Sequence, residues 1–111
     1  MSATANNQIM LVRENPASFG YRRLVGQSQV YQDLSVFVKQ RGLPNFMAET
    51  SNQDRRYFIL YYLKQREAFA CRTHSASGQS VEFAGPYPIT EREFQLLNRF
   101  RENSIEISPN R

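Results

Sequence analysis

Several residue types are scarce in this sequence, and each scarcity excludes a class of protein. There is one cysteine, Cys71, one histidine, His74, and no tryptophan. A single cysteine cannot form an internal disulfide, and a structural zinc site needs about four nitrogen or sulfur ligands. We therefore expect no disulfide framework and no metal centre. One lone cysteine also suits a reducing compartment, and we expect the protein in the cytoplasm.

Long apolar runs are missing as well. The longest, Tyr57 to Leu63, is far shorter than the roughly 18 apolar residues that a membrane helix needs. The first residues are polar and lack the basic and apolar regions of a secretory signal. The chain of 111 residues has the usual length of one domain. We expect no membrane contact, a single domain over residues 9–103, and flexible tails at 1–8 and 104–111.

The sequence also lacks the short motifs of common enzymes. None of the patterns GxxxxGK[ST], GxGxxG and GxSxG occurs, so nothing indicates a nucleotide cofactor or a serine hydrolase. The spacing Cys71-x-x-His74 invites a nucleophile and base interpretation. However, an odd offset within a strand places the two side chains on opposite faces. We expect no cofactor, and we favour a non-enzymatic protein while leaving the question open.

Two segments have the apolar periodicity of amphipathic helices, and we predict helices over residues 29–41 and 90–102. Ser28 is a suitable N-cap for the first. Thr90 and Glu93 form a capping box at the start of the second. The stripe residues are Val30, Leu34, Phe37 and Val38 in the first helix and Phe94, Leu97 and Phe100 in the second.

The segment before the first helix has a weaker pattern. Ile9 to Arg13 and Phe19 to Val25 are short apolar runs, separated by the turn signal Asn15-Pro16. Two interpretations stay open, namely two short strands or an irregular arm.

The middle of the chain is rich in aromatic residues, and we predict strands there. Tyr57 to Leu63 is apolar at every position, as expected of a strand covered on both faces. One helix over residues 54–71 is the alternative, but its apolar residues would form no stripe. The other predicted strands cover 68–74 and 80–84, with a turn at 75–79, and 46–50 as a fourth strand. The predicted fold is α+β: an antiparallel meander of three to four strands with two amphipathic helices packed on one face.

Side-chain alternation divides this sheet into two faces. A four-residue loop at 64–67 would place Leu63 opposite Ala68. The predicted core face then consists of Phe58, Leu60, Tyr62, Phe69, Cys71, Thr73, Val81 and Phe83. The other face mixes apolar residues, tyrosines and arginines, so we expect something to cover it. The candidates are residues 9–25, a second copy of the chain, or a ligand.

Arginine dominates the basic residues, with 12 arginines against two lysines. Residues 55–72 carry as much net positive charge as the whole chain, whose formal charge is +4. Arginine favours bidentate contacts to phosphate or carboxylate and stacking on aromatic rings, and tyrosines accompany the arginines here. The candidate binding residues are therefore Arg55, Tyr57, Tyr61, Arg66, Arg72 and His74.

Two functions fit this cluster. The first is that of a small binding or adaptor protein that contacts a protein partner, or itself as a homodimer, through the Tyr/Arg-bearing sheet face. The alternative is binding of single-stranded RNA or DNA through the basic aromatic segment 55–72, since open sheets with such side chains stack bases and neutralise phosphates. The glycines and the spacing of the RNA-recognition octapeptide are absent, so we favour the protein partner.

Overall fold

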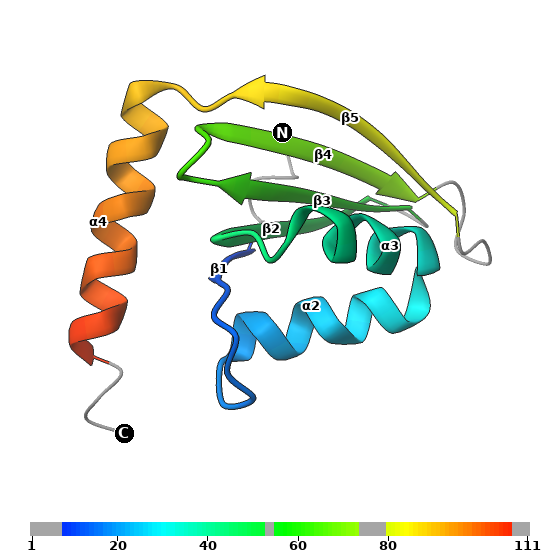
Figure 1. Ribbon diagram of the computed structural model, residues 1–111, viewed down its shortest axis with the longest axis horizontal. Coiled ribbons are helices and arrows are strands. Elements are labelled where there is room, and N and C mark those ends of the chain that lie inside the picture. Colours follow the sequence, from blue (N-terminus) through cyan, green and yellow to red (C-terminus); the bar gives the residue numbers. More distant parts are fainter. Residues whose placement is uncertain (1–7, 53–54, 74–79, 108–111) are drawn as a thin grey trace.

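The computed structural model describes residues 8–52, 55–73 and 80–107. These stretches form one five-stranded antiparallel sheet, with strands in chain order, and three helices (Figure 1). The strands are β1 (Gln8–Leu11), β2 (Phe46–Asn52), β3 (Arg55–Tyr62), β4 (Glu67–Thr73) and β5 (Val81–Pro88). The helices are α2 (Phe19–Val30), α3 (Gln32–Arg41) and α4 (Glu91–Ile107). Within the described stretches, no helix has both the length and the apolar character to cross a membrane.

The α+β class and the antiparallel meander are confirmed, with one more strand and one more helix than predicted. The aromatic segment forms β3 and is not part of a helix over 54–71. Strand β2 occupies the place predicted for the fourth strand. The fifth strand is β1, which pairs with β2 and places Met10 opposite Met47. His74 and the turn predicted at 75–79 lie outside the described residues.

The pairing of β3 with β4 differs from the prediction by two residues. Tyr62 pairs with Glu67, whereas we expected Leu63 opposite Ala68. The turn therefore comprises residues 63–66, and Arg66 adopts a left-handed φ of 58°. Because strand side chains alternate with a period of two, a shift by two residues leaves every side chain on its predicted face.

The face predicted as the core packs against α2 and α3. Helix residues Leu24 and Leu34 are almost completely buried there, beside Tyr31. The ring of Tyr31 meets that of Phe58 edge-on, with 6.1 Å between centroids. The buried sheet residues of this cluster are Met47, Phe58, Leu60, Tyr62, Phe69, Cys71 and Val81.

The two helices on this face begin and end differently from the prediction. For residues 19–25, the sequence leaves open a short strand or part of an irregular arm. In the structure they form the first turns of α2. The predicted helix over 29–41 is interrupted at Tyr31, which ends α2 and precedes α3. The N-cap is Ser18 rather than Ser28, because the Ser18 hydroxyl accepts a backbone N–H from the first turn of α2.

Helix α2 packs closely on β1 through a glycine. The buried positions of α2 are Gly20, Leu24 and Gln27, which recur at helical spacing. A Cβ atom at Gly20 would lie 2.1 Å from the carbonyl oxygen of Leu11. Only a residue without a side chain allows this approach of helix and strand.

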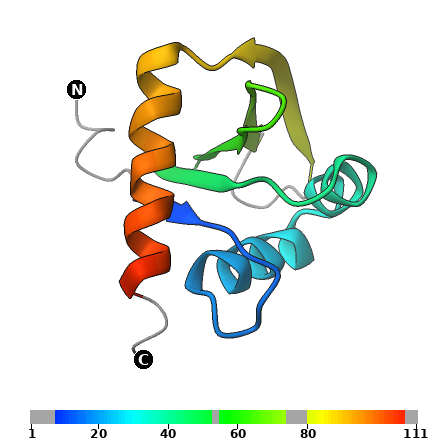
Figure 2. The same cartoon turned by 60° about the vertical axis from the view of Figure 1, so that its left-hand side comes forward.

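Helix α4 packs on the opposite face of the sheet from α2 and α3 (Figure 2), so the prediction that the helices share one face is wrong. Its residues Phe94 and Leu97 belong to a second cluster with Phe46 and Ala68. The capping box is confirmed, since Thr90 and Glu93 exchange backbone-to-side-chain hydrogen bonds of 3.1 Å. Helix α4 also continues to Ile107, into the stretch expected to be a tail.

Candidate functional site

Helix α4 divides the second face of the sheet into two halves. It crosses one end of the strands, near the turn between β3 and β4 (Figure 1). The covered half, beneath α4, contains Phe46, Tyr61 and Ala68. The strand register places a second group of side chains on the same face, beyond α4. This open half consists of Ile9, Ala48, Thr50, Arg55, Tyr57, Ile59, Ala70, Arg72, Glu82 and Ala84.

The open half is hollowed and largely apolar. A depression of about 600 Å³ lies over β3, β4 and β5, with Tyr57, Ile59 and Ala84 in its lining. Ile59 on β3 is 37% exposed and Ile9 on β1 is 44% exposed, with the buried Ala48 of β2 between them. A solvated sheet face normally carries polar side chains, so a row of Ile9, Ala48 and Ile59 across three strands is characteristic of a surface that another molecule covers.

Arg72, one of the candidate residues, forms a salt bridge with a carboxylate. It lies directly opposite Glu82 on β5, and its Nε donates to Glu82 Oε1 at 3.1 Å. A second guanidinium nitrogen contacts the same oxygen. The hydrogen bond and charge of Glu82 raise the pKa of Arg72. A phosphate binding here would have to compete with this carboxylate.

Arg66 is also engaged, and it lies in the covered half. Its guanidinium sits 3.6 Å from the centroid of the Phe94 ring, and NH1 donates to Glu91 Oε1 at 2.8 Å. The hydrogen bond from Arg66 lowers the pKa of Glu91. These contacts fasten the first turn of α4 to the β3–β4 turn, so Arg66 has a structural role here.

The two candidate tyrosines lie on the same face of β3 but in different surroundings. Tyr61 is partly buried in the cluster beneath α4, and burial, followed by the negative charge of Glu93, raises its pKa. Tyr57 lies in the open half, opposite Arg72. The structure therefore brings Arg55, Tyr57 and Arg72 together and separates Tyr61 and Arg66 from them. His74 lies outside the described residues.

Our candidate residues do not include a buried ionic cluster, which lies on the face of the sheet that packs against α2 and α3. Glu49 is only 6% exposed, and Arg23 donates to both of its carboxylate oxygens, at 2.8 and 2.6 Å. Gln27 and Arg56 donate to the same carboxylate at 3.4 and 3.5 Å. The partners of Glu49 come from α2 and from β3, so no local sequence pattern predicts this cluster. The cluster joins α2 to the sheet.

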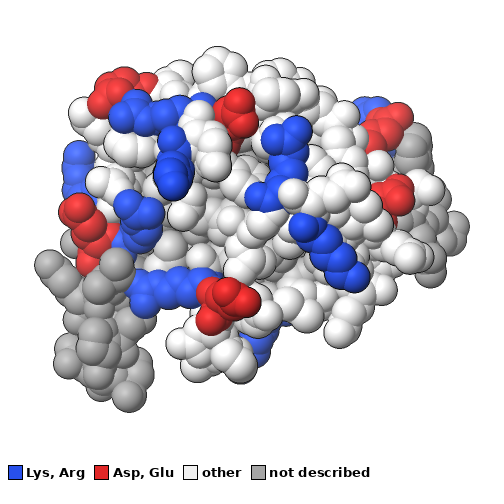
Figure 3. All heavy atoms as spheres, in the orientation of Figure 1, with Lys and Arg blue, Asp and Glu red and all other residues white. Residues whose placement is uncertain are grey.

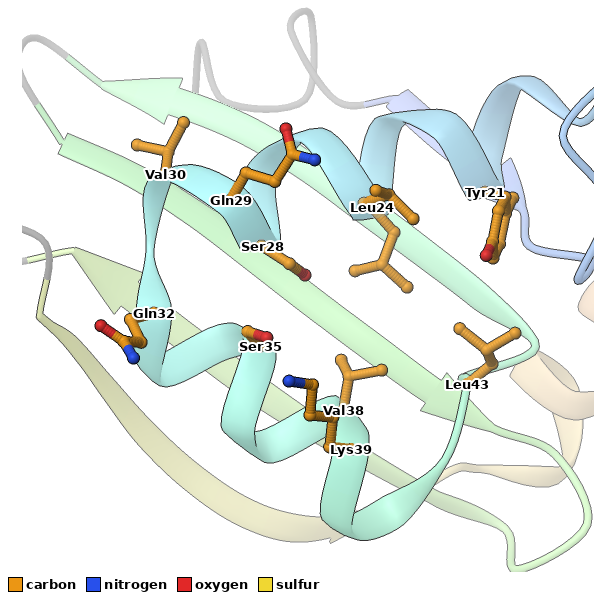
Figure 4. A pocket seen from close by; sticks show the side chains of 11 residues that line it. Tyr21, Leu24, Ser28, Gln29, Val30, Gln32, Ser35, Val38, Lys39 and Leu43 are labelled. Atoms are coloured by element: carbon orange, nitrogen blue, oxygen red, sulfur yellow. The ribbon is translucent and has the colours of Figure 1, made fainter.

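A groove of about 460 Å³ separates α2 from α3 (Figure 4). Leu24 and Leu43 point into it, while the small side chains of Ser28 and Ser35 line the seam between the helices. Large residues at these two positions would fill the space. Lys39 is the one charged residue of the lining, which contains no carboxylate, imidazole or thiol. The groove can accept an apolar group, but it holds no acid–base pair.

Among the residues that the structure describes, the remaining chemistry-bearing groups form no reactive centre. Cys71 is buried in the core, and burial raises the pKa of its thiol to about 12, which keeps it protonated. In the described part of the chain, no three His, Cys, Asp or Glu residues are grouped so as to hold a metal ion. Comparisons of the chain with protein-family models, curated proteins and solved structures give no match.

Proposed function

We propose that this chain is a non-enzymatic binding module of the cytoplasm that recognises another protein through the open half of the sheet. The observation that carries the proposal is the hollowed apolar surface around Ile59, which no described segment of the chain covers. Exposed isoleucines next to a tyrosine and a neutralised arginine resemble the composition of a protein interface, with an apolar centre and paired charges.

The charge pattern favours a protein over a nucleic acid. Of the basic residues between 55 and 72, Arg66 and Arg72 each pair with a carboxylate of their own, and Arg56 shares Glu49 with Arg23. Nucleic acid binding draws its affinity from cations that replace counterions on phosphates. On the face that Figure 3 shows, which carries α2 and α3, basic and acidic side chains are also intermixed. Positive charge that is already balanced contributes little to phosphate binding.

The face is a better binding surface than the sheet edges. At the β5 edge, the N–H of Val81 donates to Asp33 Oδ2 at 3.2 Å, and Pro86 and Pro88 have no N–H to offer. The other edge strand, β1, has four residues. Capped donors, prolines and short strands are the usual means by which proteins prevent pairing at an edge.

Photo-crosslinking tests the proposal. A p-benzoylphenylalanine replaces Ile59 in the open half, and in a control protein it replaces Val36, which is exposed on α3. We expect a protein adduct at position 59, in cells of the source organism, and none at position 36. Equal adducts at both positions, or none at either, would overturn the proposal.

A nuclease-sensitive adduct at position 59 would favour the nucleic acid alternative instead. That alternative also requires affinity to fall with salt, with a slope of about −0.7 per phosphate contacted in a plot of log K against log salt. A protein interface centred on Ile59 depends on salt much less, because its energy comes from apolar burial.

A further inference from the structure

One flank of helix α4 borders the open half and is itself apolar. Glu91 bonds Arg66 at the β3–β4 turn, so the flank that carries Glu91 faces the end of the sheet. Glu93 lies about half a turn from Glu91 around the helix, on the flank that faces the open half. Helical geometry places Leu96 and Phe100 on the side of Glu93.

Both apolar residues of this flank are exposed. Leu96 is 54% exposed and Phe100 is 45% exposed, although the Phe100 ring also stacks on Phe46 at 5.8 Å between centroids. The flank and the open half thus form one continuous angular surface, with the sheet as its floor and α4 as its wall.

The charges of this surface suit a second copy of the chain. The chain as a whole carries +4, which opposes self-association. The open half and the apolar flank contain two arginines and two glutamates, Arg55, Arg72, Glu82 and Glu93, whose charges cancel, while Arg92 and Arg99 adjoin Leu96 on the solvent side of the helix. Arg55 makes no ion pair with any described residue, and it lies on the floor, whereas Glu93 lies on the wall. Floor and wall are complementary in charge.

We infer that two copies associate about a two-fold axis, with the α4 flank of each copy seated on the open half of the other. Leu96 and Phe100 of one copy cover Ile59 of its partner, and Glu93 faces Arg55. A two-fold interface repeats every contact, so one continuous surface supplies both halves of it. This inference rests on the proposed function, because it names the partner of the same surface.

Charge-bearing substitutions test the reciprocity by sedimentation of the purified full chain. We expect the wild-type protein to dimerise at about 100 µM. Ile59→Lys alone, or Leu96→Glu alone, places a charge against an apolar side chain twice per dimer. Each such contact should weaken association about tenfold, which gives about a hundredfold per dimer. Val36→Lys is the matched control, since Val36 is 45% exposed on the other side of the molecule, and it should leave association unchanged.

An equimolar mixture of the Ile59→Lys and Leu96→Glu variants gives the decisive result. A heterodimer retains one wild-type contact between Ile59 and Leu96 and pairs the new lysine with the new glutamate. We therefore expect dimers in the mixture while each variant alone is monomeric. Circular dichroism establishes that both variants fold.

Three results would overturn the inference: a wild-type monomer at about 1 mM, a dimer that neither substitution weakens, or a mixture that stays monomeric. The proposed function can survive this failure. If the purified chain is monomeric while crosslinking at position 59 still yields an adduct with a different protein, the surface binds another partner. Failure of both experiments would remove both proposals.

Discussion

The contact between α2 and β1 can be tested with two glycines of the same helix. Gly20 is buried against β1, and an alanine Cβ there would lie 2.1 Å from the Leu11 carbonyl oxygen and 2.8 Å from its carbonyl carbon. Gly26 is exposed, and a Cβ atom there would meet nothing within 4 Å. Gly20→Ala and Gly26→Ala are therefore chemically identical changes in opposite environments.

The structure gives the two changes opposite effects. Non-bonded carbon atoms prefer separations of about 3.5 to 4.0 Å, so Gly20→Ala forces α2 to move away from β1 by roughly 1 to 2 Å. Overpacking of this kind costs about 1 to 3 kcal/mol, against a gain in helix propensity of at most about 1 kcal/mol at position 20. Gly26→Ala keeps the propensity gain alone and should stabilise the protein by about 0.5 to 1 kcal/mol. Because the propensity gain is common to both, the two variants should differ by the overpacking cost, about 1 to 3 kcal/mol.

Urea denaturation followed by far-UV circular dichroism measures this difference. Equal m-values for the two variants would establish that the difference lies in the free energy of unfolding and not in the denatured state. If Gly20→Ala proves as stable as Gly26→Ala, then β1 and α2 do not approach each other as described, and the order of the sheet at that edge is wrong.

Three further predictions concern charge and capping. Glu49→Gln should lower the free energy of unfolding by about 2 kcal/mol, because the buried carboxylate loses its charge-assisted hydrogen bonds. Glu82→Gln, in an exposed pair, should cost less than about 1 kcal/mol, and urea denaturation compares the two. Thr90→Val removes the hydroxyl acceptor of the capping box and should cost about 1 kcal/mol, measured by calorimetry. Burial raises the pKa values of Cys71 and Tyr62 to about 12 in the folded protein, from 9.0 and 10.0. The contribution of these two groups to the free energy of unfolding is therefore fully present below about pH 9. It is lost as the pH rises toward 12, by up to about 1.4 kcal/mol per pH unit for each group. Denaturation midpoints that stay constant up to pH 11 would contradict this, and Cys71→Ala should remove the decline that begins near pH 9.

The second half of the fold could be predicted because large side chains and caps carry its signals. The run from Tyr57 to Leu63 has no helical stripe, and the pair of Thr90 and Glu93 marks the start of α4 without reference to the rest of the chain. The division of the sheet into faces survived a register error, because the error was of two residues and side chains alternate with a period of two.

Helix α2 could not be predicted from apolar periodicity, because two of its three buried positions are Gly20 and Gln27. Both are explained by distant partners. Gly20 is required by the Leu11 carbonyl of β1, and Gln27 donates to Glu49 of β2. Apolar periodicity identifies the buried side of a helix only when the buried residues are apolar. In α2 the buried positions are instead determined by the close approach of Gly20 to β1 and by the ionic cluster around Glu49.

The extent of the candidate site depends on α4, whose position no local pattern encodes. The stripe of Phe94 and Leu97 indicates that α4 buries one side, but it is equally compatible with either face of the sheet. Arg66 and Phe94 are in contact at the end of the strands, and this contact places α4 across Tyr61 and not across Tyr57. Two tyrosines that are equivalent in the strand pattern thereby differ in their surroundings: Tyr61 packs beneath α4, whereas Tyr57 lines the depression of the open half. Arg66, which the charge pattern predicts as a binding residue, instead helps to determine where the open half of the sheet begins.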